Sequence, residues 1–154
     1  MRLIKSFYYA LSGIGYCIKN ETNFRVHIVA MLTVIVFSCI YNVPNYEKAI
    51  LTILISLVMV AELINTAIES MVDKISPEKS ENAKIAKDTA AGAVLVFALS
   101  AVICAVFLFS DIQKWIENVI PVIYTYWYFA LIYVVVCWLF IFKYGNKKKI
   151  KNIR

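Results

Sequence analysis

The sequence lacks the residues from which several common sites and folds are built. Its four cysteines form no CxxC pair, and its single histidine, His27, has no second histidine with which to share a metal ion. We therefore expect small buried cysteines and a structural histidine. Only four glycines are present, none of them in a G-x-x-x-x-G-K-[ST] loop, and no HRD or DFG motif occurs. These absences exclude the P-loop and protein-kinase folds.

Long stretches of the chain also lack charge. Residues 89–109 carry none, and as a helix they would extend about 31 Å, enough to cross a bilayer. Hydrophobic residues make up 62% of the chain, well above the ~45–50% of soluble domains. The composition therefore predicts an integral membrane protein.

The spacing of apolar residues predicts an all-α fold. Residues 2–20 carry apolar side chains at helical intervals and no signal-peptide cleavage site, which is typical of an amphipathic surface helix. Further segments follow: crossings at about 25–41, 46–73 and 84–110, a fourth transmembrane helix within 111–142, and a basic tail at 143–154. We expect residues 1–110 to form one domain and the fourth helix, which is rich in Tyr and Trp, to be an addition to it.

The basic residues predict the orientation of the chain. Of the sixteen Lys and Arg residues, all but Lys48 and Lys114 lie in the N-terminal helix and its exit, in the loop between the second and third crossings, or in the tail. Because basic residues favour the cytoplasmic side, we expect both termini and that loop to be cytoplasmic. A net charge of +6 can indicate nucleic-acid binding, but this distribution of the basic residues argues against a nucleic-acid partner.

A polar stripe interrupts the second crossing, in the stretch AELINTAIESMVD. Its residues follow one another at intervals of three or four, so they share one helix face: Glu62, Asn65, Glu69 and Asp73. Glu62 lies deepest, about 16 Å of helix from Asp73. A carboxylate inside a membrane span costs at least ~2.5–3.5 kcal/mol, which makes it a functional residue by default.

The predicted topology brings further charged residues to the cytoplasmic end of this stripe. Glu21 begins the first crossing, and Lys87 with Asp88 begins the third. Carboxylates suit Mg²⁺, which keeps substrate phosphate oxygens as ligands, and lysine suits phosphate. A deeper carboxylate suits a general base that accepts a proton from a hydroxyl group. This combination indicates phosphoryl transfer to a membrane lipid.

Two other functions are compatible with an intramembrane carboxylate stripe. In a small ion or proton transporter the stripe would be the ion pathway. In a structural membrane subunit, Glu62 and Asn65 would instead pair across an oligomer interface. The apolar outer half of the second crossing weakens the first alternative, and the cytoplasmic convergence of charges weakens the second.

The motifs AELINTAIESMVD and AKIAKDTAAGAVL, with NETNFRVH before the first crossing, resemble the prokaryotic diacylglycerol kinase family, which includes undecaprenol kinases. The resemblance covers about residues 2–110, and ELINTAIE followed by AKDTAAGAV is more similar to the undecaprenol kinase branch. It implies an ATP- and Mg²⁺-dependent kinase of undecaprenol or diacylglycerol in the bacterial cytoplasmic membrane. It also implies a homotrimer in which neighbouring subunits share each active site.

The resemblance also implies roles for individual residues. Glu62 would be the catalytic base, Glu21 and Glu69 the Mg²⁺ ligands, and Asn65 and Asp73 supporting residues. The implied nucleotide-binding residues are Arg2, Tyr9, Glu21, Glu69, Glu78, Lys79, Ser80, Lys87 and Asp88. The loop sequence EKS at 78–80 departs from the family pattern, and so does the fourth hydrophobic span.

Overall fold

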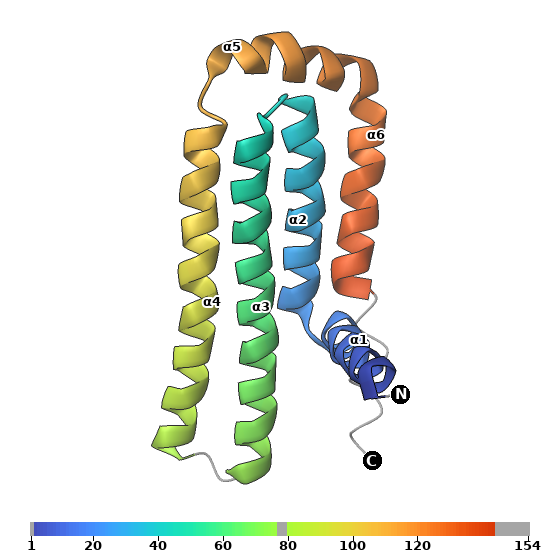
Figure 1. Ribbon diagram of the computed structural model, residues 1–154. Coiled ribbons are helices and arrows are strands. Elements are labelled where there is room, and N and C mark those ends of the chain that lie inside the picture. Colours follow the sequence, from blue (N-terminus) through green and yellow to red (C-terminus); the bar gives the residue numbers. More distant parts are fainter. Residues whose placement is uncertain (1, 77–79, 144–154) are drawn as a thin grey trace.

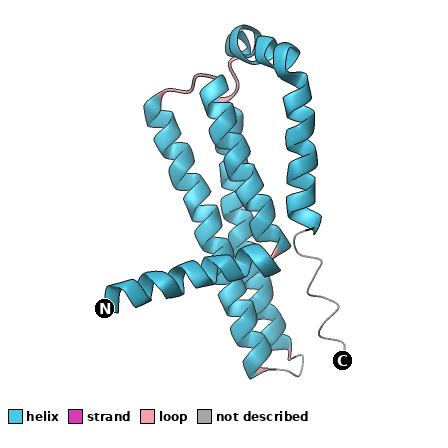
Figure 2. Cartoon of the chain, turned by 90° about the vertical axis from the view of Figure 1, so that its right-hand side faces the viewer, coloured by secondary structure: helices cyan, strands magenta, loops and turns pink. Residues whose placement is uncertain are grey.

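The computed structural model describes residues 2–76 and 80–143, and all regular structure in these residues is helical. The elements are α1 (Arg2–Asn20), α2 (Thr22–Ile40), α3 (Asn45–Ile75), α4 (Glu81–Leu108), α5 (Ile112–Lys114), the π-helical turn η1 (Trp115–Val119), α6 (Ile120–Trp138) and the π-helical turn η2 (Leu139–Lys143). Helices α2, α3, α4 and α6 run side by side, and α1 lies across the ends of α2 and α6, where it passes α3 (Figures 1 and 2). From residue 144 on, the predicted basic tail lies outside the described residues.

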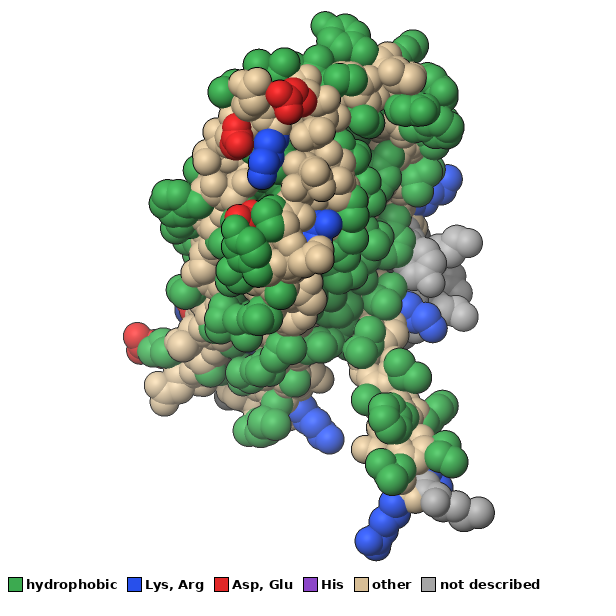
Figure 3. Space-filling view, turned by 45° about the horizontal axis from the view of Figure 1, so that its top comes forward, with side chains coloured by type: hydrophobic (Ala, Val, Ile, Leu, Met, Phe, Trp, Pro, Cys, Tyr) green, Lys and Arg blue, Asp and Glu red, His purple; other side chains and the backbone are tan. Residues whose placement is uncertain are grey.

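Four helical segments are long and apolar enough to cross a membrane. They are α2, α3, α4 and the continuous stretch Ile112–Lys143. Large hydrophobic side chains are exposed along all four, and Figure 3 shows such side chains over most of the face that it presents. Because an exposed apolar surface of this extent is stable in lipid rather than in water, the structure confirms the predicted all-α membrane fold.

The short connections between the long helices follow from local sequence. Asn42 turns the chain between α2 and α3 with a φ of 58°, a left-handed conformation that asparagine tolerates better than most residues. Pro44 then precedes α3, where its missing N–H group breaks no helical hydrogen bond. At the opposite end of the bundle, the Ser80 hydroxyl caps α4 by accepting a hydrogen bond from the Ala83 N–H group at 3.2 Å.

An aromatic cluster joins the fourth membrane segment to the end of α2. The Phe37 ring lies 4.9 Å from Phe109 and 5.2 Å from Trp115, measured between ring centroids. The Trp115 indole donates a hydrogen bond to the Phe109 carbonyl group at 2.8 Å, and the buried Tyr41 hydroxyl donates one to the Asp111 carbonyl group at 2.9 Å. Aromatic packing with satisfied polar groups therefore anchors this end of the bundle.

The fourth membrane segment is bent. Tyr126 has non-helical angles (φ −120°, ψ 23°) within α6. The part before the bend runs across the end of the bundle, and the part after it descends beside α2 (Figure 1). The Thr125 hydroxyl donates to the Pro121 carbonyl group at 2.9 Å, a contact that often bends helices. The segment predicted as one helix at 111–142 therefore consists of two helical parts that meet at an angle.

The Tyr41 hydroxyl gives a test of this anchor. Tyr41→Phe should lower the free energy of unfolding by about 1 kcal/mol, because it removes one buried hydrogen bond and leaves the Asp111 carbonyl group without that donor. Thermal unfolding of the protein in detergent micelles measures the change. Tyr124→Phe is the matched control, since the Tyr124 side chain is 81% exposed and should tolerate the loss. Equal effects of the two substitutions would contradict the assigned role.

Candidate active site

The deep end of the polar stripe lies where α3 passes the junction of α1 and α2. Glu62 is only 2% exposed, although it belongs to a helix long and apolar enough to span a membrane. Its charge interacts with those of Glu21, at the junction, and Glu69, two helical turns further along α3. The structure thus brings together the predicted base and the two predicted metal ligands.

Glu21 is held in an unfavourable position for a negative charge. It is the residue between α1 and α2, and partial burial raises the pKa of its carboxyl group above the usual value. The nearby Glu69 carboxylate raises this pKa further, while the Arg25 guanidinium opposes the increase. Two carboxylates that repel each other in this way are a suitable arrangement for a divalent cation.

Asn65 adds an unsatisfied acceptor to the same site. Its side-chain nitrogen Nδ2 donates to Glu69 Oε1 at 3.0 Å, which fixes the orientation of the amide. The amide oxygen is buried, in a residue only 6% exposed, and has no hydrogen-bond partner within residues 2–76 and 80–143. Such an atom calls for a ligand, and an amide oxygen on a side chain that is hydrogen-bonded to the Glu69 carboxylate is a ligand type that Mg²⁺ accepts. Within residues 2–76 and 80–143, no group of three or more His, Cys, Asp or Glu side chains is arranged to hold a metal ion.

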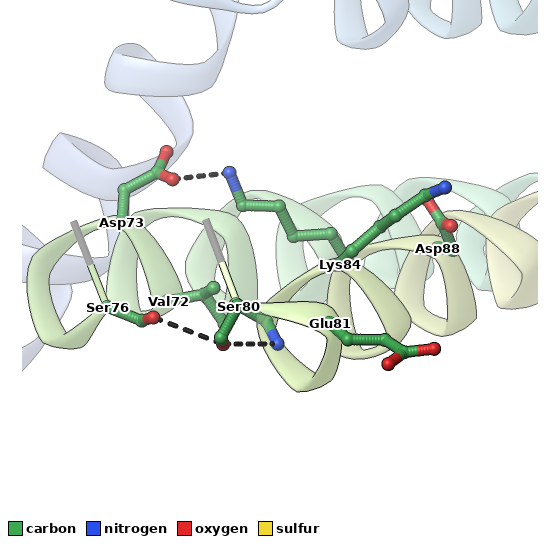
Figure 4. Close-up of a pocket in the computed structure, with 9 residues that line it drawn as sticks. Val72, Asp73, Ser76, Ser80, Glu81, Lys84 and Asp88 are labelled. Atoms are coloured by element: carbon green, nitrogen blue, oxygen red, sulfur yellow. Dashed lines mark hydrogen bonds and ion pairs between the residues drawn. The ribbon is translucent and has the colours of Figure 1, made fainter. Parts of the chain in front are cut away.

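The shallow end of the stripe opens into a pocket between α3 and α4. The pocket has a volume of about 470 Å³ and is lined by Val72, Asp73, Ser76, Ser80, Glu81, Ala83, Lys84, Lys87 and Asp88. Figure 4 shows Asp73 on α3 with a lysine side chain from α4 directed toward it, and Lys87 forms an ion pair with Asp73. On the other side, the Ser76 and Ser80 hydroxyls lie 3.3 Å apart. This pocket combines two lysines and two hydroxyl groups, which suit phosphate, with three carboxylates from Asp73, Glu81 and Asp88.

The remaining predicted residues lie elsewhere. Arg2 and Tyr9 belong to the N-terminal half of α1, which projects away from the vertical helices (Figure 2). Within one chain they are therefore not brought to the stripe. Glu78 and Lys79 lie outside the described residues.

Two contacts at the site were not predicted from the sequence. Cys17 on α1 is buried and forms a hydrogen bond with Thr66 on α3, next to Glu62 and Glu21. Arg25 is also buried and bridges three chain segments. The first contact could have been predicted, because Thr66 lies four residues after Glu62 and therefore on the same face of the helix. No local sequence pattern predicts the contacts of Arg25, because two of its three acceptors are backbone carbonyl groups, which every residue has.

Comparison with known proteins gives consistent matches. The sequence model of the prokaryotic diacylglycerol kinase family matches residues 8–109. An undecaprenol kinase of Bacillus subtilis is 39% identical over 108 residues, which cover 70% of this chain and 88% of that protein. A diacylglycerol kinase of Escherichia coli is 37% identical over 102 residues, covering 66% and 84%. A diacylglycerol kinase of Synechocystis sp. is 43% identical over 102 residues, and the match spans only 58% of that protein.

The raised pKa of Glu21 predicts how stability depends on pH. The folded protein favours the protonated carboxyl group, so this stabilising contribution is complete below the ordinary pKa of 4.5 and is lost as the pH rises through the raised pKa. The melting temperature of metal-free protein should therefore fall over this interval, and Glu21→Gln should make the fall shallower.

Glu81→Gln is the matched control, because Glu81 is an exposed carboxylate at the start of α4. It should keep the wild-type pH dependence. Melting curves that shift equally with pH in wild-type and Glu21→Gln protein would contradict the assignment.

Proposed function

The chain belongs to the prokaryotic diacylglycerol kinase family, and from this membership we propose that it transfers the γ-phosphoryl group of ATP to the hydroxyl group of a membrane lipid. The observation that carries the proposal is the buried Glu62 carboxyl group beside Glu21 and Glu69, on a helix long and apolar enough to span a membrane. The lipid is undecaprenol or diacylglycerol, the compounds named for the relatives.

Glu62 is the general base of the proposed reaction. Its carboxylate accepts the proton of the lipid hydroxyl group while the hydroxyl oxygen bonds to the γ-phosphorus and the bond to the leaving ADP oxygen breaks. Burial between helices excludes water, which would otherwise compete with the lipid as acceptor. A position on the continuous helix α3 fixes the carboxylate relative to Asn65 and Glu69.

Glu21, Glu69 and the amide oxygen of Asn65 are the residues that would hold Mg²⁺. The bound ion would neutralise phosphate charge as it develops during transfer. The protein's own contribution is positional: the hydrogen bond from Asn65 to Glu69 orients both side chains, and the α1–α2 junction presents Glu21. The unsatisfied amide oxygen supports this assignment independently of the carboxylates.

The pocket between α3 and α4 is the proposed nucleotide site. Lys84 and Lys87 would contact phosphate oxygens, and Lys87 would exchange its ion pair with Asp73 for them. The N-terminal half of α1, which carries Arg2 and Tyr9, projects away from the other helices within one chain (Figure 2). These two residues could contact the nucleotide only in a neighbouring subunit, an arrangement that agrees with a homotrimer that shares its active sites.

The chain is a multi-pass membrane protein, and we place it in the bacterial cytoplasmic membrane. Fourteen of its sixteen basic residues lie in segments that the topology assigns to one side. This side includes the α3–α4 connection and both termini, so the proposed nucleotide pocket opens toward cytoplasmic ATP.

Glu62→Gln tests the proposed base. The substitution keeps the size and the hydrogen-bonding capacity of the side chain but removes its proton acceptor, so kcat should fall by about 10²–10⁴-fold. Binding of a non-hydrolysable ATP analogue should change little, as measured by calorimetry in micelles. Glu117→Gln is the control, because Glu117 lies on η1 at the opposite end of the bundle. Full turnover by the Glu62→Gln protein would contradict the assignment of Glu62 as the general base.

The lipid acceptor is identified by transfer of labelled γ-phosphate. Purified full-length protein in mixed micelles with Mg²⁺ and ATP should label undecaprenol or diacylglycerol, and the two products separate by chromatography. Label on undecaprenol indicates recycling of a lipid carrier, and label on diacylglycerol indicates formation of phosphatidate. If folded protein labels neither lipid, the proposed activity is wrong.

A further inference from the structure

Arg25 is a buried cation that is bonded through all three of its side-chain nitrogens. It is 2% exposed. Its Nη1 atom donates to the Ile18 carbonyl group at 3.0 Å, Nη2 to the Thr22 hydroxyl group at 3.0 Å, and Nε to the Ile141 carbonyl group at 2.9 Å. A buried cation is stable only when its donors are satisfied, so these three acceptors fix its position.

Two of these bonds enclose Glu21. Ile18 lies in the last turn of α1, and Thr22 is the first residue of α2. The guanidinium group therefore holds the chain on both sides of Glu21. It also places a positive charge at the C-terminal end of α1, where the helix dipole favours one.

The third bond reaches a segment outside the family match. Ile141 belongs to η2, at the end of the fourth membrane segment, whereas the family model ends at residue 109. A second hydrogen bond joins the same two parts of the protein: the hydroxyl groups of Thr33 on α2 and Tyr133 on α6 lie 2.8 Å apart. Of these two bonds, that of Arg25 lies at the α1–α2 junction.

We infer that Arg25 is a positioning residue for Glu21, and that the fourth membrane segment completes this role by supplying the Ile141 carbonyl group. The inference rests on the proposed function in one respect, namely that Glu21 binds a divalent cation. The fourth helix is then a part of the active-site framework. Within residues 2–76 and 80–143, the side chain of Arg25 provides a hydrogen bond between this segment and the junction.

The geometry explains why arginine is required at this position. Its planar guanidinium directs donors in three separate directions, toward α1, α2 and η2. A lysine at the same position keeps the charge but has a single nitrogen, which cannot reach all three acceptors. Arg25→Lys should therefore release η2 and loosen the junction without removing the buried charge.

Cation binding by full-length protein in micelles, without turnover, tests the effect on Glu21. Free Mn²⁺ is measured by electron paramagnetic resonance in the presence of a non-hydrolysable ATP analogue. Arg25→Lys should weaken Mn²⁺ binding about tenfold, the equivalent of one lost charge-assisted hydrogen bond. Thr22→Val removes one acceptor only, and should weaken binding in the same direction by a smaller factor.

Tyr133→Phe is the matched control. It removes a hydrogen bond between α2 and the fourth segment that lies away from the junction, so Mn²⁺ binding should be unchanged. Unchanged Mn²⁺ binding in both Arg25→Lys and Thr22→Val would overturn the positioning role, and so would equal weakening by Tyr133→Phe.

Fluorine NMR of protein containing 5-fluorotryptophan tests the attachment of the fourth segment. Trp138 lies just before η2, and Trp115 lies in the aromatic cluster at the far end. Arg25→Lys should shift the Trp138 resonance and leave that of Trp115 in place, which also shows that the variant is folded. An unmoved Trp138 resonance would overturn the attachment. Because neither measurement requires phosphoryl transfer, absence of lipid kinase activity would refute the proposed function separately.

Discussion

The burial of the Glu62 carboxyl group among apolar helices is the constraint on which the rest of the structure depends. A group of this kind needs polar neighbours, and the nearest available backbone is already hydrogen-bonded within α3. The charged groups nearest to it are instead two further carboxylates, Glu21 at the α1–α2 junction and Glu69 two turns further along α3. Three carboxylates that repel one another favour a shared cation. The surface helix α1 ends beside this group. The junction in turn requires its own internal cation, Arg25.

One straight helix organises both halves of the site. Glu62, Asn65, Glu69 and Asp73 lie on one face of α3, which runs without interruption over 31 residues. The deep half of the face meets the α1–α2 junction, and the shallow half meets α4. An acceptor bound at the deep end and a phosphoryl donor bound at the shallow end would be aligned along a single rigid element. Sites held in this way keep their geometry better than sites on loops.

The sequence predicts the helices and the stripe because both depend on short-range periodicity. Runs of apolar residues predicted the membrane fold, and intervals of three and four residues predicted that Glu62 and Glu69 share a face. Contacts between distant segments were not predictable in the same way. Arg25 and Ile141 are 116 residues apart, and the acceptor is a backbone carbonyl group that every residue possesses. The bend at Tyr126 was also missed, since it occurs without a proline or glycine at that position.

The bend in α6 has a consequence for the membrane around the protein. Residues 127–143, which follow Tyr126, have a helical length of about 25 Å, less than the ~30 Å hydrocarbon thickness of a typical bilayer. The uncharged part of helix α4, residues 89–108, has about 30 Å. The two flanks of the molecule therefore impose unequal hydrophobic lengths on the surrounding lipid. Bilayer thinning beside α6 relieves this mismatch, so the chain would deform its membrane asymmetrically and favour thinner regions.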